Sequence, residues 1–324
     1  MPSPGVNAGR VALTQRSTSS RVLRPLTVVI VIGFAIHILL PQVGELGQAF
    51  QSLRAGRWRY LGLAFVGAGL TFVSGAWMVW ISTDLRPPFG RTILGQIAAS
   101  FMATVTPAGL GWIGVTQGYL QRAGAEEGTA SAATTLNMLV TFLSHIALLI
   151  LLLPFLPTMK LPTVTLPSTQ AVVEIVFVAL VAIGIVLWIP ASRRGILTRL
   201  MGMVRAAPVI ISDPRRSAGM VGGAVAANAA FAIALVGSVA AYGPLPSLLG
   251  IMVAYMIAAT AAAVSPTPGG LGVMETALVS ALVRLGVVSG PAVAAVLTFR
   301  VMTFWLPLVV GAWVWRVGRK RGWL

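Results

Sequence analysis

An apolar region of the chain, residues 247–285, is interrupted by Val264-Ser265-Pro266-Thr267-Pro268-Gly269-Gly270-Leu271-Gly272. Proline removes a backbone donor and glycine destabilises a helix interior, so this stretch predicts that one helix ends and another begins. A second cluster, Thr106-Pro107-Ala108-Gly109-Leu110-Gly111, divides residues 91–122 in the same way. The segments on either side hold roughly 12–18 residues, whereas an independent span needs about 20. We therefore predict two re-entrant helical hairpins, each broken at its Pro/Gly cluster.

The composition of the whole chain is that of a membrane protein. Of its 324 residues, 57% are hydrophobic and 9% are charged, and the mean hydropathy is +0.90. So few charges cannot cover a soluble surface, and the same proportions exclude disorder. We predict an all-α integral membrane protein with about six full spans, near residues 25–41, 58–81, 128–154, 171–189, 217–241 and 291–315.

The charge distribution predicts an orientation in the membrane. The net charge is +16, from 23 Lys and Arg against 7 Asp and Glu. With a cytoplasmic N-terminus, 17 of the 23 basic residues fall inside, Arg300 falls within a span, and five fall outside, namely Arg54, Arg57, Arg59, Lys160 and Arg284. This bias follows the positive-inside rule, so we expect both termini in the cytoplasm, a location in the cell membrane, and no nucleic-acid partner. In this topology the two hairpins enter from opposite sides.

An internal sequence repeat is consistent with two hairpins that enter the membrane from opposite sides. A shift of 162 residues aligns Arg122–Phe142 with Arg284–Phe304 and gives eight identities in 21 positions. A shift of 161 pairs Pro107 with Pro268 and aligns the two Gly-Leu-Gly triplets. Inverted repeats of this kind are typical of alternating-access carriers. We predict a basic tail over 1–20, a first membrane repeat over 21–160 and a second over 161–324.

Arg300 is the charge that topology does not explain. It lies near the middle of the last span, where an arginine costs roughly 2.5–3.5 kcal/mol and must be compensated. Glu275 follows Gly272 by three residues, in the first turn of the predicted half-helix, where the helix dipole favours a carboxylate. One interpretation is a structural ion pair and a capping charge. The other is a Glu275–Arg300 pair that opens for an anion, since the forked donors of arginine suit phosphate.

The break supplies the remaining candidate ligands. Glycines let a backbone approach a ligand closely, and a half-helix N-terminus presents free N–H groups to an anion. An alternative interpretation of the break is a turn that needs small residues for packing. For Asn137, the alternative is a hydrogen bond between helices. Besides Arg300 and Glu275, we assign to the binding site Pro268, Gly269, Gly270, Gly272, Ser265, Thr267, Thr106 and Asn137.

Enzymatic chemistry has little support in the sequence. The chain has no cysteine, two histidines, His37 and His145, and seven acidic residues. None of these lie at metal-ligand spacing, and no positioned acid and base is evident. We predict no catalytic residues, no metal and no cofactor.

The second half carries a family resemblance. Val264–Gly272 with Glu275, Leu297–Arg300 and Thr303–Pro307 resembles the C-terminal signature of the lysylphosphatidylglycerol synthase transmembrane-domain family, a flippase-like domain. The resemblance covers about residues 25–316. It implies movement of aminoacylated phosphatidylglycerol between leaflets, often with a fused aminoacyl-transferase. We expect the stand-alone form, because only a short basic tail follows the last span. Gly111–Gln117 lacks the Gly-Glu and following Arg of many members. We therefore expect the substrate to be an anionic phospholipid or lipid-linked precursor and do not restrict it to the lysyl lipid.

Three hypotheses follow for function. The first is a flippase-like transporter of an anionic phospholipid or lipid-linked precursor, with the headgroup bound at mid-membrane. The second is a non-transporting scaffold that presents lipid to a separate lipid-modifying enzyme, with a purely structural Arg300–Glu275 pair. The third is a carrier of small ions.

Overall fold

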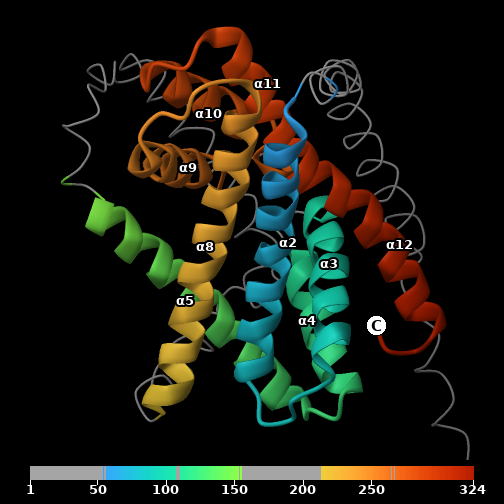
Figure 1. Cartoon of the computed structure of the whole chain (residues 1–324). Helices are drawn as coiled ribbons and strands as arrows, with labels where there is room; N and C mark the ends of the chain where they lie inside the picture. The colour runs from blue at the N-terminus through green and yellow to red at the C-terminus, as the bar shows by residue number, and fades with distance from the viewer. Residues whose placement is uncertain are drawn as a thin grey trace, which may run out of the picture. The chain divides into compact units, whose positions relative to one another are not determined.

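The computed structural model describes residues 54, 56–106, 110–152, 154, 213–263, 265 and 267–324, which belong to one compact unit, Ala49–Leu324. In this part of the chain every regular element is a helix, and no strand occurs (Figure 1). The predicted tail at 1–20 and the predicted spans at 25–41 and 171–189 lie outside the described residues.

The helices follow a long, short, short, long order that occurs twice. The first set is α2 (Trp58–Ile81), α3 (Phe89–Val105), α4 (Leu110–Arg122) and α5 (Glu127–Leu152). The second set begins with α8 (Pro214–Tyr242), α9 (Leu248–Ala263) and α10 (Val273–Arg284). It ends with α11 (Ser289–Arg300), a π-helical turn η5 (Val301–Trp305) and α12 (Leu306–Lys320), which continue one another.

Four helices in the described part are long and apolar enough to cross a membrane. They are α2, α5, α8 and the continuous helix Ser289–Lys320, and they coincide with the predicted spans at 58–81, 128–154, 217–241 and 291–315. At about 1.5 Å per residue, the 24 residues of α2 extend about 36 Å, which exceeds the hydrocarbon core of about 30 Å. The chain is a multi-pass membrane protein.

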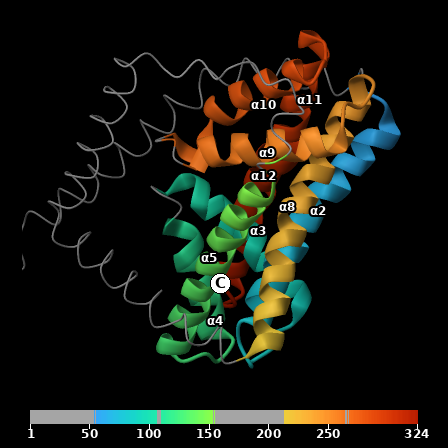
Figure 2. The ribbon, with the colours of Figure 1, turned by 90° about the vertical axis from the view of Figure 1, so that its left-hand side faces the viewer.

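Both Pro/Gly clusters end one helix and begin another, as predicted. α3 ends at Val105 and α4 begins at Leu110, while α9 ends at Ala263 and α10 begins at Val273. The four half-helices have 17, 13, 16 and 12 residues. Because α3 packs against α4 and α9 against α10, each cluster joins a pair of contacting half-helices (Figure 2).

The same C-terminal turn closes both pairs. At the end of α4, the Ala125 N–H donates to the Leu120 carbonyl at 2.9 Å, around Gly124 with φ of 105°. At the end of α10, the Val287 N–H donates to the Leu282 carbonyl at 3.0 Å, around a glycine with φ of 91°. This is the Schellman arrangement, which needs a left-handed residue and therefore favours glycine. It gives a structural cause for the Gly124/Gly286 identity in the sequence repeat.

α2 and α8, the first long helices of the two sets, pack in backbone contact. A Cβ added at Gly67 would lie 2.5 Å from the backbone nitrogen of Ala234, and one at Gly237 would lie 2.5 Å from that of Ala64. Residue numbers fall along α8 as they rise along α2, so the helices are antiparallel (Figure 1). Small residues that admit such close approach are the usual means of association between helices in lipid.

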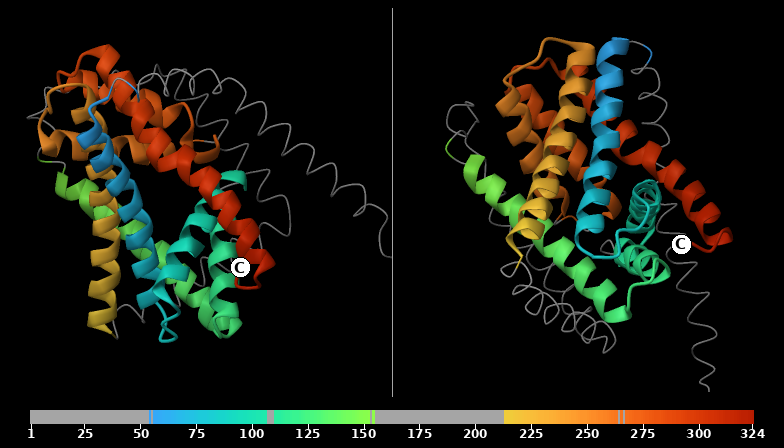
Figure 3. Two further views of the ribbon diagram at one scale, coloured as in Figure 1. Left: turned by 45° about the vertical axis from the view of Figure 1, so that its right-hand side comes forward. Right: turned by 60° about the horizontal axis from the view of Figure 1, so that its bottom comes forward.

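The last helix of each set also packs against a short helix of the other set. α12, from the second set, packs against α3 of the first, and a Cβ at Gly311 would lie 2.5 Å from the Ile97 carbonyl oxygen (Figure 3). In the reciprocal contact, α5 packs against α9, and His145 Nε2 lies 3.0 Å from Thr260 Oγ1. The pair α3–α4 lies where α2 ends and α8 begins, and α9–α10 lies toward the other end (Figures 1 and 2).

The glycine contacts predict where a methyl group destabilises the protein. Gly237→Ala should lower the free energy of unfolding by about 1–3 kcal/mol, since the new Cβ meets the backbone of Ala64. Gly222→Ala is the matched control on the same helix, because a Cβ there meets nothing within 4 Å. Unfolding of the two variants in detergent would be compared with that of the wild type. Equal stabilities would contradict close α2–α8 packing.

Candidate functional site

The backbone between α9 and α10 takes a left-handed path that glycine permits. Pro268–Gly270 forms one 3-10 turn, η4, and Gly269, Gly270 and Gly272 have φ of 63°, 65° and 82°. Space is also short at the first two glycines. A Cβ at Gly269 would lie 3.1 Å from Cζ of the Phe304 ring, and one at Gly270 would lie 2.9 Å from the Ala262 Cα. The close contacts and positive φ angles together explain the run of glycines.

Glu275 lies in the first turn of α10, as predicted. Its Oε2 accepts a hydrogen bond of 2.7 Å from the backbone N–H of Gly272, which satisfies a free donor at the helix start. A carboxylate here is also favoured by the positive end of the helix dipole. The side chain is 17% exposed, and a Cβ at Gly272 would meet nothing within 4 Å, so the site opens on this side.

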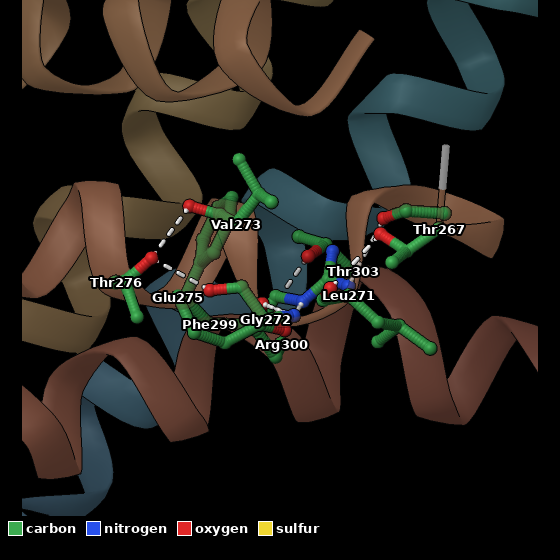
Figure 4. Close-up of polar contacts among 10 residues, drawn as sticks. Thr267, Leu271, Gly272, Val273, Glu275, Thr276, Phe299, Arg300 and Thr303 are labelled. Carbon is green, nitrogen blue, oxygen red and sulfur yellow. Dashed lines mark hydrogen bonds and ion pairs between the residues drawn. The ribbon is translucent and has the colours of Figure 1, made fainter. Parts of the chain in front are cut away.

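Arg300 ends α11 with its side chain buried at 8% exposure. Its Nε donates to Glu275 Oε1 at 2.5 Å (Figure 4). Its Nη2 donates to the Gly269 carbonyl at 3.2 Å. The guanidinium carbon also lies 4.3 Å from the centroid of the Phe304 ring. Carboxylate, carbonyl and aromatic face together compensate the charge. In the described part of the chain, no hydrogen bond engages Nη1.

A π-helical turn follows Arg300 directly. The Leu306 N–H reaches back five residues to the Val301 carbonyl, and the next residue, Pro307, has no N–H to donate. The missing donor and the wider turn interrupt the regular series of α-helical backbone hydrogen bonds beside the site. π-turns within α-helices are frequent at functional sites.

The hydroxyl groups of the break stabilise the loop itself. Thr267 Oγ1 donates to the Leu271 carbonyl at 2.9 Å (Figure 4). It also lies 2.7 Å from Ser265 Oγ, which accepts from the Thr267 N–H at 3.2 Å. Both predicted residues therefore shape the path of the glycines, and no described hydrogen bond joins them to Arg300.

Thr106 and Asn137 lie in the first set of helices. Thr106 caps α3, where its Oγ1 donates to the Met102 carbonyl at 2.6 Å and accepts from the Gly111 N–H at 2.7 Å. Asn137 is buried on α5, and its Nδ2 has no hydrogen-bond partner among the described residues. No described hydrogen bond joins either residue to Arg300, so their membership of the binding site stays a prediction.

The charge pair differs from the remaining ion pairs of the described segments. Those join Arg216 to Asp84 and to Asp213, at the start of α8, and Asp84 is 90% exposed. Arg300 and Glu275 instead meet inside the helical packing. Among the described residues, no group of three or more His, Cys, Asp or Glu is placed to hold a metal ion.

Comparison with protein families decides where the chain belongs. The sequence model of a family described as the lysylphosphatidylglycerol synthase TM region matches residues 22–311. The chain belongs to this family. The match includes both Pro/Gly breaks, Glu275 and Arg300, and it confirms the resemblance seen in the second half. Among curated proteins, no relative matches the chain.

Phe304 is the site residue that the sequence analysis did not single out for a role. It follows Arg300 by four residues, and its ring contacts both the guanidinium and the Gly269 backbone. An aromatic residue about one turn after a buried arginine is the feature that could have identified it, because such a ring can accept the cation.

The ion pair predicts unequal losses of stability in this family member. Glu275→Gln should cost about 3 kcal/mol, because it leaves a buried guanidinium that cannot lose its proton. Arg300→Met should cost less, since the remaining carboxylate keeps its hydrogen bond from the Gly272 N–H at the positive end of the helix dipole. The double variant Arg300→Met/Glu275→Gln should lie nearest the wild type. Unfolding in detergent measures all three, with Glu127→Gln on α5 as the control.

A second prediction concerns the contact between Gly269 and Phe304. Gly269→Ala and Gly272→Ala both place a side chain at positive φ, but only the first also meets the aromatic ring. Gly269→Ala should therefore be the less stable variant by about 1–3 kcal/mol. Adding Phe304→Leu should restore part of that difference. Equal unfolding temperatures of the two alanine variants would refute this packing.

Proposed function

We propose that this family member is a transporter, not an enzyme, and that it moves an anionic phospholipid or lipid-linked precursor between leaflets. The observation that carries the proposal is the Arg300 guanidinium, buried at a glycine break and held by one carboxylate beside a helix N-terminus. Charged side chains inside membranes commonly mark substrate pathways. The partner is a membrane lipid, and the headgroup phosphate binds at Arg300.

The chemistry of the donors supports a phosphate ligand. Arginine binds phosphate through paired N–H groups, and the Nη1 of Arg300 carries no described hydrogen bond. The start of α10 adds the Gly272 N–H, 2.7 Å from the Glu275 carboxylate. Helix N-termini bind phosphate by such N–H groups and by the dipole. Both Gly269 and Gly272 are exposed, and a Cβ at Gly272 would meet nothing within 4 Å, so the site is open at Gly272.

An inverted repeat is supported by the packing. The equivalent helices α2 and α8 are antiparallel, as a two-fold axis in the membrane plane requires. The contacts α3–α12 and α5–α9 form a reciprocal pair under the same operation. We propose on this basis that the two broken pairs are re-entrant hairpins that enter from opposite sides, with both termini cytoplasmic. The predicted boundaries 21–160 and 161–324 divide the repeats.

The site lies where the two halves meet. η4 packs against α3, and η5 packs against α2, so both second-half elements around Arg300 contact the first half. Transporters built from inverted repeats bind substrate at such an interface, beside broken helices. Relative movement of the halves would expose Arg300 to each leaflet in turn, which is the physical basis of the proposed leaflet exchange.

Translocation in proteoliposomes tests the proposal. The full chain would be reconstituted with fluorescent phosphatidylglycerol, and exchange between leaflets would be followed by quenching from outside. Arg300→Ala should reduce the protein-dependent rate at least about tenfold, the loss of roughly one charge-assisted bond. Arg284→Ala, which removes a charge at the end of the adjacent α10, should keep the wild-type rate.

A charge exchange separates transport from a scaffold role. In a scaffold that presents lipid to a separate lipid-modifying enzyme, Arg300→Glu/Glu275→Arg retains the ion pair and should retain function. In the proposed transporter the exchanged pair should not restore translocation, because the cation then lies at the helix start. A folded Arg300→Ala variant that translocates at the wild-type rate would falsify the proposed mechanism.

A further inference from the structure

The Glu275 carboxylate occupies the position that an anionic ligand would take. Its Oε1 accepts from Arg300 Nε at 2.5 Å and its Oε2 accepts from the Gly272 N–H at 2.7 Å. A guanidinium and a helix-start N–H are the two donor types that bind phosphate oxygens in proteins. One carboxylate therefore bridges both donors with its two oxygens, as two phosphate oxygens could. A phosphate that takes both the Arg300 Nε and the Gly272 N–H must displace Glu275 from them.

Displacement changes the charge balance of the site. The resting pair of Arg300 and Glu275 is neutral, and both side chains are mostly buried, at 8% and 17% exposure. A phosphodiester headgroup brings one negative charge, and Arg300 can neutralise only one of the two anions. A carboxylate left unpaired in a low-dielectric site is costly, and it becomes neutral by binding a proton.

We propose that Glu275 takes up one proton when a monoanionic phosphodiester replaces it on Arg300. This inference rests on the proposed function, to which it adds that lipid binding is coupled to proton uptake. In the exchange, the hydrogen bonds from Arg300 Nε and Gly272 N–H to the carboxylate break, and the same donors bind phosphate oxygens. A proton from water binds the released carboxylate. The site is neutral before and after, and headgroup and proton enter and leave together.

The two helices packed on α10, α9 and α11, carry no carboxyl group and no histidine, and the described histidine bonded to α9 is His145 of α5, at Thr260. α10 packs against α9, whose ionisable residue is the buried Tyr255, and against α11, whose ionisable residue is Arg300. α3, which packs on η4, carries Arg91 in its first turn. α8, which packs on α11, carries Arg215 and Arg216 in its first turn and ends in Tyr242, whose hydroxyl lies 2.7 Å from that of Thr298. α10 itself ends in Arg284. Within the described residues, the carboxyl beside Arg300 is that of Glu275 alone.

The same count of charges limits the substrate class. One guanidinium and one proton balance one carboxylate and one phosphodiester. A diphosphate carries at least one further negative charge, for which the described site has no second cation. The geometry therefore favours a headgroup joined through a phosphodiester over one joined through a diphosphate.

Calorimetry on the full chain tests proton uptake directly. The protein in a phosphate-free maltoside detergent would be titrated with short-chain phosphatidylglycerol in buffers of different ionisation enthalpy at one pH. The dependence of the heat on the buffer gives the protons bound. We expect about one proton per lipid, and an affinity that rises about tenfold for each pH unit lowered in the range of uptake. Heat that is independent of the buffer would overturn the inference.

Two variants and two ligands sharpen the result. Glu127→Gln, in the first turn of α5, should keep the wild-type proton uptake, whereas Glu275→Gln should bind lipid without it. Uptake that persists in Glu275→Gln overturns the assignment to this residue. A short-chain lipid diphosphate or inorganic phosphate that binds as tightly as phosphatidylglycerol overturns the phosphodiester class. Lipid binding without proton uptake leaves the proposed function standing, while a wild-type protein that binds no anionic lipid overturns both.

Discussion

A guanidinium that is always charged must be neutralised wherever the chain buries it, and the second half of this protein is built around that constraint. Arg300 receives a carboxylate from α10, a carbonyl from η4 and an aromatic face from η5. The carbonyl reaches it because Gly269 adopts a left-handed conformation close against the ring of Phe304. The helix break, the π-turn and the ion pair thus form one arrangement, since each places one ligand of the same cation.

The two halves share a helix order but not this charge. At the shift of 161 residues the position of Glu275 corresponds to Gly114, and at 162 that of Arg300 corresponds to Met138. The first break is instead closed by the Thr106 hydroxyl, which bridges α3 and α4. The repeat therefore supplies matching scaffolds on which only the second break holds a charged pair. This difference between the halves is compatible with a carrier in which the second half binds the ligand and moves against the first half.

Much of the described fold could be predicted because lipid leaves the backbone few choices. Proline and glycine end helices wherever they cluster, so the bounds of α3, α4, α9 and α10 follow from the sequence. Arg300 and Glu275 stood out for a similar reason, since a charge within an apolar span needs a partner.

What the sequence did not predict depends on contacts between distant segments. The position of Phe304 one turn after Arg300 indicates a contact with the cation, but it does not indicate that the same ring packs against Gly269 of η4. Thr106 and Asn137 were assigned to the site by their polarity, which does not indicate their hydrogen-bond partners. The Thr106 hydroxyl bonds within the first break, and Asn137 is buried on α5 with no described partner for its Nδ2.

The backbone contact between α2 and α8 has a consequence for how a lipid could leave the protein. Where glycines at 67 and 237 admit no methyl group, they also admit no acyl chain. The α2–α8 seam is closed to hydrocarbon along these contacts, so it cannot serve as a lateral gate. In the proposed transporter, the tails of a lipid bound in this conformation therefore extend into the bilayer through another side of the helix packing.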